Sequence, residues 1–158
     1  MTHAEHPSIQ RVTTELAAHG ATGDVRVLPD SARTAATAAA ALGCEVGAIA
    51  NSLVFAADGA PVLILTSGAH RVDTDKCATD LGVTALRRAT PEFVRTHTGQ
   101  AIGGVAPIGH PAPIRTLVDR WLQKYDDVWA AAGHPHAVFN TTYDELLRMT
   151  DGEPVEVE

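Results

Sequence analysis

An Asp-Gly pair separates two apolar runs near the middle of the chain. The first run reads IANSLVFA from position 49, and the second reads APVLILTS over residues 60–67. Asp58 and Gly59 between them indicate a β-hairpin, because both residue types tolerate the backbone angles of a tight two-residue turn. The second run is apolar on both faces, which favours a central, covered strand. We therefore expect the chain to fold around this antiparallel hairpin.

Helical and extended patterns alternate on both sides of the hairpin. Ile9, Val12 and Leu16 follow the spacing of an amphipathic helix, and residues 34–42 are nearly all alanine, the best helix former. Such interleaving predicts an α/β or α+β domain. Further helices are expected over 73–81, 90–99 and 142–149, and short strands over 24–28, 114–118, 128–132 and 137–139.

The length of 158 residues is that of one domain. We expect a single domain over residues 1–150 and an acidic tail, residues 151–158, that is frayed. No apolar run approaches the ~18 residues of a membrane span, and the N-terminus lacks the pattern of a signal peptide. These features predict a cytoplasmic protein without a membrane partner.

Charge and cysteine content exclude several kinds of site. The net charge is -7, from 12 basic and 19 acidic residues, so no broad surface for duplex DNA is expected, although contact with one end of a nucleic acid remains open. Cys44 and Cys77 form no CxxC pair, so neither a disulfide framework nor a structural zinc site is indicated. Oligomeric state is left open.

The segment GGVAPIG, residues 103–109, is the most unusual local feature. Paired glycines let the backbone approach a ligand, and preorganised amide groups stabilise negative charge that develops on a carbonyl oxygen. The alternative is a tight connection between a helix and a strand. No GK[ST] follows, so the segment is not a P-loop.

Two polar pairs are further candidates for a site. Asn51 and Ser52 interrupt an apolar strand, where buried polar groups need partners, so they form either a hydrogen-bonded core pair or part of a site. His134 and His136 could bind metal only with further ligands, which the sequence does not identify. One histidine facing a pocket is the more plausible arrangement.

These segments together resemble the YbaK/prolyl-tRNA-synthetase editing-domain family. The resemblance runs from the first helix to Met149, and the glycine segment 103–109 is its most specific part. It implies a mixed, barrel-like β-sheet flanked by helices, and a trans-acting deacylase that hydrolyses mischarged tRNA, often tRNA for proline. The partners implied are the aminoacyl-tRNA acceptor end and a synthetase, with no cofactor and no metal.

The resemblance also assigns roles to residues. Asn51, Gly103 and Gly104 are expected to be catalytic. Substrate binding is expected from Ser52, Val105, Ala106, Pro107, Ile108, Gly109 and His136, with His134 as the alternative histidine.

One position departs from the family pattern. Many members carry a lysine, important for activity, where this chain has Asn51, and the only lysines here are Lys76 and Lys124. An amide carries no charge, so an electrostatic anchor is lost unless an arginine replaces it. Arg33 and Arg71 are the candidates. The leading hypothesis is a deacylase with an altered site, the second a binding module without turnover, and the third a metal hydrolase that uses His134 and His136.

Overall fold

The computed structural model describes residues 6–21, 23–32 and 34–158. The helices are α1 (Pro7–Ala18), α2 (Ala35–Leu42), α3 (Thr74–Leu81), α4 (Pro91–Thr98) and α5 (Tyr143–Thr150), with the 3-10 helices η2 (Val46–Ala48) and η3 (Arg120–Lys124). The strands are β1 (Val25–Val27), β2 (Ile49–Ala57), β3 (Ala60–Ser67), β4 (Leu86–Arg88), β5 (Arg115–Asp119), β6 (Val128–Ala131), β7 (Ala137–Thr141) and β8 (Glu153–Val155).

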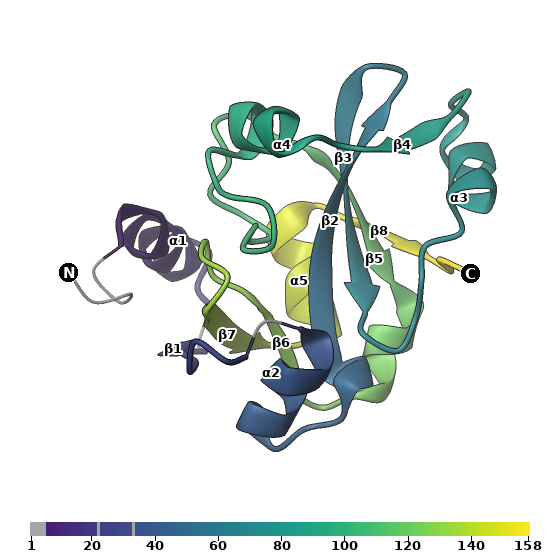
Figure 1. Ribbon diagram of the computed structural model, residues 1–158. Helices are drawn as coiled ribbons and strands as arrows, with labels where there is room; N and C mark the ends of the chain where they lie inside the picture. The colour runs from purple at the N-terminus through teal and green to yellow at the C-terminus, as the bar shows by residue number, and fades with distance from the viewer. Residues whose placement is uncertain (1–5, 22, 33) are drawn as a thin grey trace.

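The predicted hairpin is confirmed as the centre of the sheet. β2 and β3 pair in antiparallel fashion from Ala50 opposite Ser67 to Ala57 opposite Ala60. Asp58 and Gly59 make the turn with φ angles of 50° and 92°. Figure 1 shows the two strands as the long central ribbons, with β6, β7 and β1 on one side of them and β5 and β8 on the other.

Parallel and antiparallel pairs are combined in one eight-stranded sheet. β2 with β6, β3 with β5, and β5 with β8 run parallel, whereas β6 with β7, β7 with β1, and β2 with β4 run antiparallel. One face packs against α1, α4, α5 and the segment 105–108, while α3 and α2 cover separate parts of the other face. The expected mixed sheet flanked by helices is therefore confirmed.

The C-terminal residues belong to this fold, so the prediction of a frayed tail over 151–158 is wrong. β8 pairs with β5, and Val155 and Val157 are only 6% and 1% exposed in an apolar cluster beneath α3. In the sequence, the acids that alternate with valines suggest a solvated tail. In an extended backbone, however, the same alternation places the valine side chains together on the core side.

Within the described part of the chain, no helix combines the length and apolarity that crossing a membrane requires.

Candidate active site

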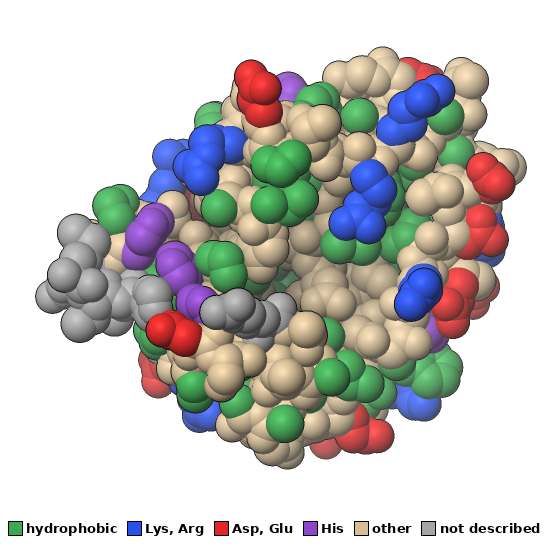
Figure 2. Space-filling view, viewed as in Figure 1, with side chains coloured by type: hydrophobic (Ala, Val, Ile, Leu, Met, Phe, Trp, Pro, Cys, Tyr) green, Lys and Arg blue, Asp and Glu red, His purple; other side chains and the backbone are tan. Residues whose placement is uncertain are grey.

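A cleft of about 220 Å³ opens between β2, the segment after α4, and α2. Figure 2 looks onto this face, which is hollowed near its centre. Its walls are mainly apolar, and the polar groups come from a few positions on different elements. Those positions include Asn51 and Ser52 of β2, Arg88 of β4, and the backbone at Gly103.

The cleft forms where the pairing of β2 is interrupted. One edge of β2 pairs with β3 along its whole length. The other edge pairs with β6 only at Ile49 and Ala50, and with β4 only from Phe55 to Ala57. Residues 51–54 between these two partners all line the cleft. The sheet thus presents an open strand edge to whatever enters.

The cleft brings together two of the three predicted catalytic residues. Asn51 and Gly103 both line it, although they are far apart in the sequence. Gly103 is exposed and has a φ of +88°, a conformation that side chains disfavour. Gly104 lies behind it, because a Cβ atom there would be 2.5 Å from the backbone of His134 and Pro135. Gly104 is therefore required for close packing of two loops.

The predicted binding residues divide in the same way. Ser52 and Val105 line the cleft. Ala106, Pro107, Ile108 and Gly109 are buried behind it and are absent from the lining among the described residues. His136 is also outside that lining, whereas its neighbour Pro135 contributes to it.

Most of the segment 103–109, called the glycine loop below, is held by side chains that the sequence did not single out. Gln100 is 2% exposed; its Oε1 accepts from the Ala106 N–H (2.7 Å) and its Nε2 donates to Ile108 O (3.3 Å). The Gly104 N–H donates to Ala101 O at 3.0 Å. The amides of Gly104 and Ala106 are thus occupied, and no bond is recorded within the described residues for those of Gly103 and Val105.

His110 fixes the far end of the glycine loop. Its Nε2 lies 2.8 Å from Ala106 O, and since a carbonyl oxygen only accepts, His110 donates through its Nε2–H. Burial lowers the pKa of His110 below its usual value, and the carbonyl contact opposes this only in part.

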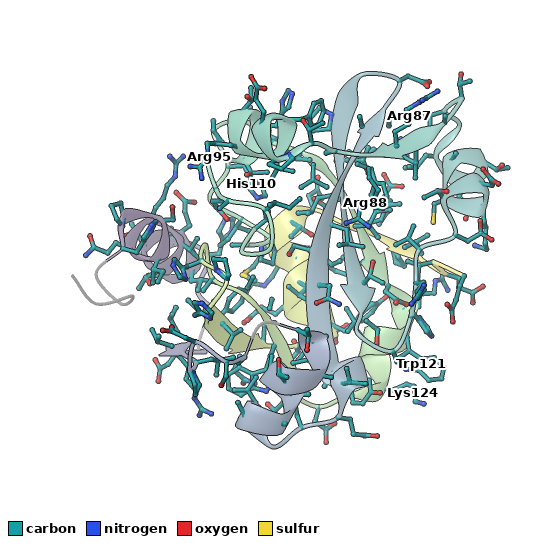
Figure 3. The ribbon with its side chains drawn as sticks, in the orientation of Figure 1. Arg87, Arg88, Arg95, His110, Trp121 and Lys124 are labelled. Atoms are coloured by element: carbon teal, nitrogen blue, oxygen red, sulfur yellow. The ribbon has the colours of Figure 1, made fainter. Side chains whose placement is uncertain are left out.

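Arg88 is the charged side chain of the cleft that sequence reasoning missed. Among the described lining residues it alone is charged. Figure 3 shows it beside β2, well away from Lys124. Only the pairing of β4 with β2 brings it there, since Arg88 lies opposite Phe55.

The cations expected from the sequence lie elsewhere or outside the described residues. Arg33 is not among the described residues, and Arg71 lies outside the described cleft lining, with its backbone N–H donating to Glu158. The Lys76 ammonium pairs with Asp80 at 3.0 Å, and that of Lys124 lies 3.7 Å from the centre of the Trp121 ring.

Three imidazole rings lie in a row, and two of them, His134 and His136, flank Pro135 of the cleft lining. The ring centres of His6 and His134 are 5.1 Å apart, and those of His134 and His136 are 5.5 Å apart. Figure 2 shows histidine side chains gathered on this face near α1. Across the residues that the structure describes, no three His, Cys, Asp or Glu side chains are grouped to hold one metal ion. Among these described residues, the histidine pair therefore gains no set of further ligands for a metal ion.

Solved structures resemble this architecture over nearly its full length. One is described as a "putative trans-editing enzyme for prolyl tRNA synthetase"; it is 44% identical, with a TM-score of 0.92, and the match covers 97% of this chain and 98% of that one. A second, a hypothetical protein named APE2540, is 27% identical with a TM-score of 0.85, over 93% of this chain and 98% of that one.

Relatives with similar sequences also match most of this chain. The Bacillus subtilis (strain 168) protein YwhH is 31% identical over 90% of this chain and 91% of its own length. The proline–tRNA ligase of Levilactobacillus brevis is 28% identical over 68% of this chain, which spans only 19% of that enzyme. The model of the aminoacyl-tRNA editing domain matches residues 29–149. This match includes β2, the glycine loop and most of the cleft between them. The chain therefore belongs to the aminoacyl-tRNA editing domain family.

Proposed function

We propose that this chain is a trans-acting deacylase that hydrolyses the ester between a wrong amino acid and the end of a tRNA, the tRNA for proline being the first candidate. The observation that carries the proposal is the cleft in which the unpaired edge of β2 meets the amides of Gly103 and Val105, for which no hydrogen bond is recorded within the described residues. Membership of the editing family and the likeness to a protein described as acting for prolyl-tRNA synthetase support it.

The size of the cleft indicates which part of the substrate it takes. Its volume of about 220 Å³ is below the roughly 300–1,000 Å³ of pockets that enclose drug-sized ligands. A small aminoacyl group fits this space, with the terminal nucleotide at the rim. A hydrolytic pocket of this kind removes small amino acids that a synthetase cannot discriminate well by binding alone.

The proposed reaction needs positioning and electrostatics rather than a covalent enzyme intermediate. Water adds to the ester carbonyl, the C–O bond to the tRNA breaks, and the tRNA hydroxyl leaves with a proton. The amides of Gly103 and Val105 donate to the oxygen on which negative charge develops. Asn51 orients the ester, and the neighbouring ribose hydroxyl of the substrate assists the water.

Arg88 replaces, in this proposal, the cation that the family carries on β2. A guanidinium binds phosphate through several N–H groups at once. At the mouth of the cleft, Arg88 contacts the phosphate next to the terminal nucleotide. The charge therefore comes from β4 rather than from position 51.

The test is release of amino acid from alanyl-, cysteinyl- and seryl-tRNA for proline, compared with the rate in buffer. We expect release above that rate for at least one of them. No release from any member of the panel contradicts the proposal.

The uncharged Asn51 favours a second candidate, a module that binds an aminoacyl or nucleotide ligand without turnover. Asn51→Lys separates the two functions. If the variant hydrolyses a substrate that the wild type leaves intact, the wild type is a binder. If the variant weakens an existing activity, Asn51 is adapted to its own substrate.

A further inference from the structure

The open edge of β2 directs the backbone of Ser52 into the cleft. Successive residues of a strand point their N–H and C=O groups to opposite edges. Ile49 O accepts from Gly68 N at 2.8 Å, toward β3, and Val54 O accepts from Ala89 N at 3.3 Å, toward β4. Counting between these two positions, Ser52 faces the β4 side. No bond is recorded within the described residues for its N–H or its C=O.

The side chain of Ser52 is equally unpartnered. Its hydroxyl oxygen is buried, and no described residue gives it a hydrogen bond. On the same face of β2 lie Ala50 and Val54, which pack with Val94 and Val105 in the largest apolar cluster. A hydroxyl group left without a partner in such surroundings costs free energy, so a ligand atom is the natural partner.

The Ser52 N–H and C=O are the donor and acceptor with which a strand residue pairs with its neighbour. The Ser52 hydroxyl oxygen adds a second acceptor beside them. In an antiparallel sheet, two opposite residues exchange both of their backbone hydrogen bonds. An aminoacyl ester carries the same pair, an α-ammonium donor and a carbonyl acceptor on adjacent carbons. It can therefore add to an open strand edge as a single residue.

We propose that Ser52 binds the amino-acid part of the substrate as one residue of an added strand. The Ser52 C=O and hydroxyl oxygens accept from the α-ammonium, and the Ser52 N–H donates to the ester carbonyl. The second lone pair of that carbonyl faces the glycine loop. The inference rests on the proposed function, and it defines the substrate class as esters with a free α-amino group.

The other lining residues agree with this assignment. No described residue of the cleft wall is an Asp or a Glu, so the ammonium has no carboxylate partner there. Neutral oxygen acceptors, such as those of Ser52, must then hold it. A hydrogen bond from a charged donor is stronger than one between neutral groups, which makes a few such acceptors sufficient.

The experiment compares two esters on the same tRNA for proline, alanyl and propionyl, which differ only in the α-amino group. Rates are divided by the buffer rate, because the ammonium itself activates the ester. We expect the wild type to accelerate hydrolysis of the propionyl ester less than hydrolysis of the alanyl ester, by a factor of roughly ten or more. Ser52→Ala lowers the acceleration of the alanyl ester and leaves that of the propionyl ester unchanged.

Thr66→Val is the matched control. Thr66 lies next to Leu65, the β3 partner of Ser52, and its hydroxyl is also buried without a recorded partner, but it does not line the cleft. The variant is expected to keep the wild-type preference between the two esters. Equal acceleration of both esters by the wild type, or an equal loss for both in Ser52→Ala, overturns the inference.

A binding measurement keeps this test separate from that of the proposed function. The probes are 3′-amino-3′-deoxyadenosine carrying an alanyl or a propionyl group in amide linkage, which resists hydrolysis. Tighter binding of the alanyl probe that weakens in Ser52→Ala, which keeps the backbone C=O but lacks the hydroxyl, supports the inference even if no ester is hydrolysed. Equal affinity for both probes overturns it, while hydrolysis of the alanyl ester by the same protein still supports the deacylase function.

Discussion

At the scale of single residues, Gln100 holds the glycine loop through two hydrogen bonds. Replacing it with alanine leaves the Ala106 N–H and Ile108 O, both in buried residues, without their partners. An unsatisfied buried polar group costs about 1–3 kcal/mol, so we expect Gln100→Ala to lower the free energy of unfolding by at least that amount. Urea denaturation measures this. Hydrolysis should fall as well, because the loop amides lose their fixed positions.

Gln123 provides the control for this variant, since it is an exposed glutamine in η3. Gln123→Ala should change the unfolding free energy by no more than about 0.5 kcal/mol. Similar small effects in both variants would show that Gln100 does not hold the loop.

His110 makes stability depend on pH. Its pKa is lowered in the fold, first by burial, while an unfolded histidine keeps the ordinary value of 6.5. Between these two pKa values the unfolded chain binds more protons, so the folded state loses stability as the pH falls below the unfolded value. We expect wild type to lose more unfolding free energy from about pH 7.5 to about pH 5 than His110→Gln, which keeps a donor for Ala106 O.

The measurement is urea denaturation at both pH values. His19→Gln, which removes the histidine that follows the last residue of α1, serves as the control. Parallel pH profiles for wild type and His110→Gln would contradict the assignment.

At the scale of elements, β8 supports the end of the sheet below α3. Val157 is 1% exposed and Val155 is 6% exposed, both in the apolar cluster that includes α3 residues. Val157→Ala removes buried methyl groups and should cost about 1–3 kcal/mol of unfolding free energy. Thermal denaturation checks this against Glu156→Ala, whose side chain is exposed. A frayed C-terminus predicts the same melting temperature for both variants.

Elements with strong local signals were predictable from sequence. The Asp58-Gly59 turn and the alanine-rich α2 fold as expected. β4 was missed because it has only three residues and two of them are exposed arginines. β8 was missed because it pairs with a strand far away in sequence and contains a proline, so only tertiary contact makes it a strand.

The candidate site likewise contains some residues that the sequence predicts and others that only the fold brings into place. Asn51 and the glycine loop stand out in the sequence as polar and glycine-rich interruptions of apolar segments. Arg88 and Gln100 do not, because the first acquires its place through β4 pairing with β2 and the second is an ordinary amide until the fold buries it. The open edge at Ser52 follows from strand pairing, which local sequence does not specify.

For the molecule as a whole, charge predicts how binding of a nucleic acid responds to salt. With a net charge of -7 and Arg88 as the only charged residue in the described cleft lining, we expect few phosphates to be contacted. Each phosphate contacted on a single strand contributes roughly -0.7 to the slope of log affinity against log salt concentration.

Arg88→Gln should therefore change the slope of log kcat/KM against log salt concentration, measured with a mischarged tRNA, and make it less negative by about 0.7. Arg87→Gln, which removes the neighbouring exposed arginine outside the described lining, should leave the slope nearly unchanged. Equal slopes in all three proteins would mean that Arg88 contacts no phosphate.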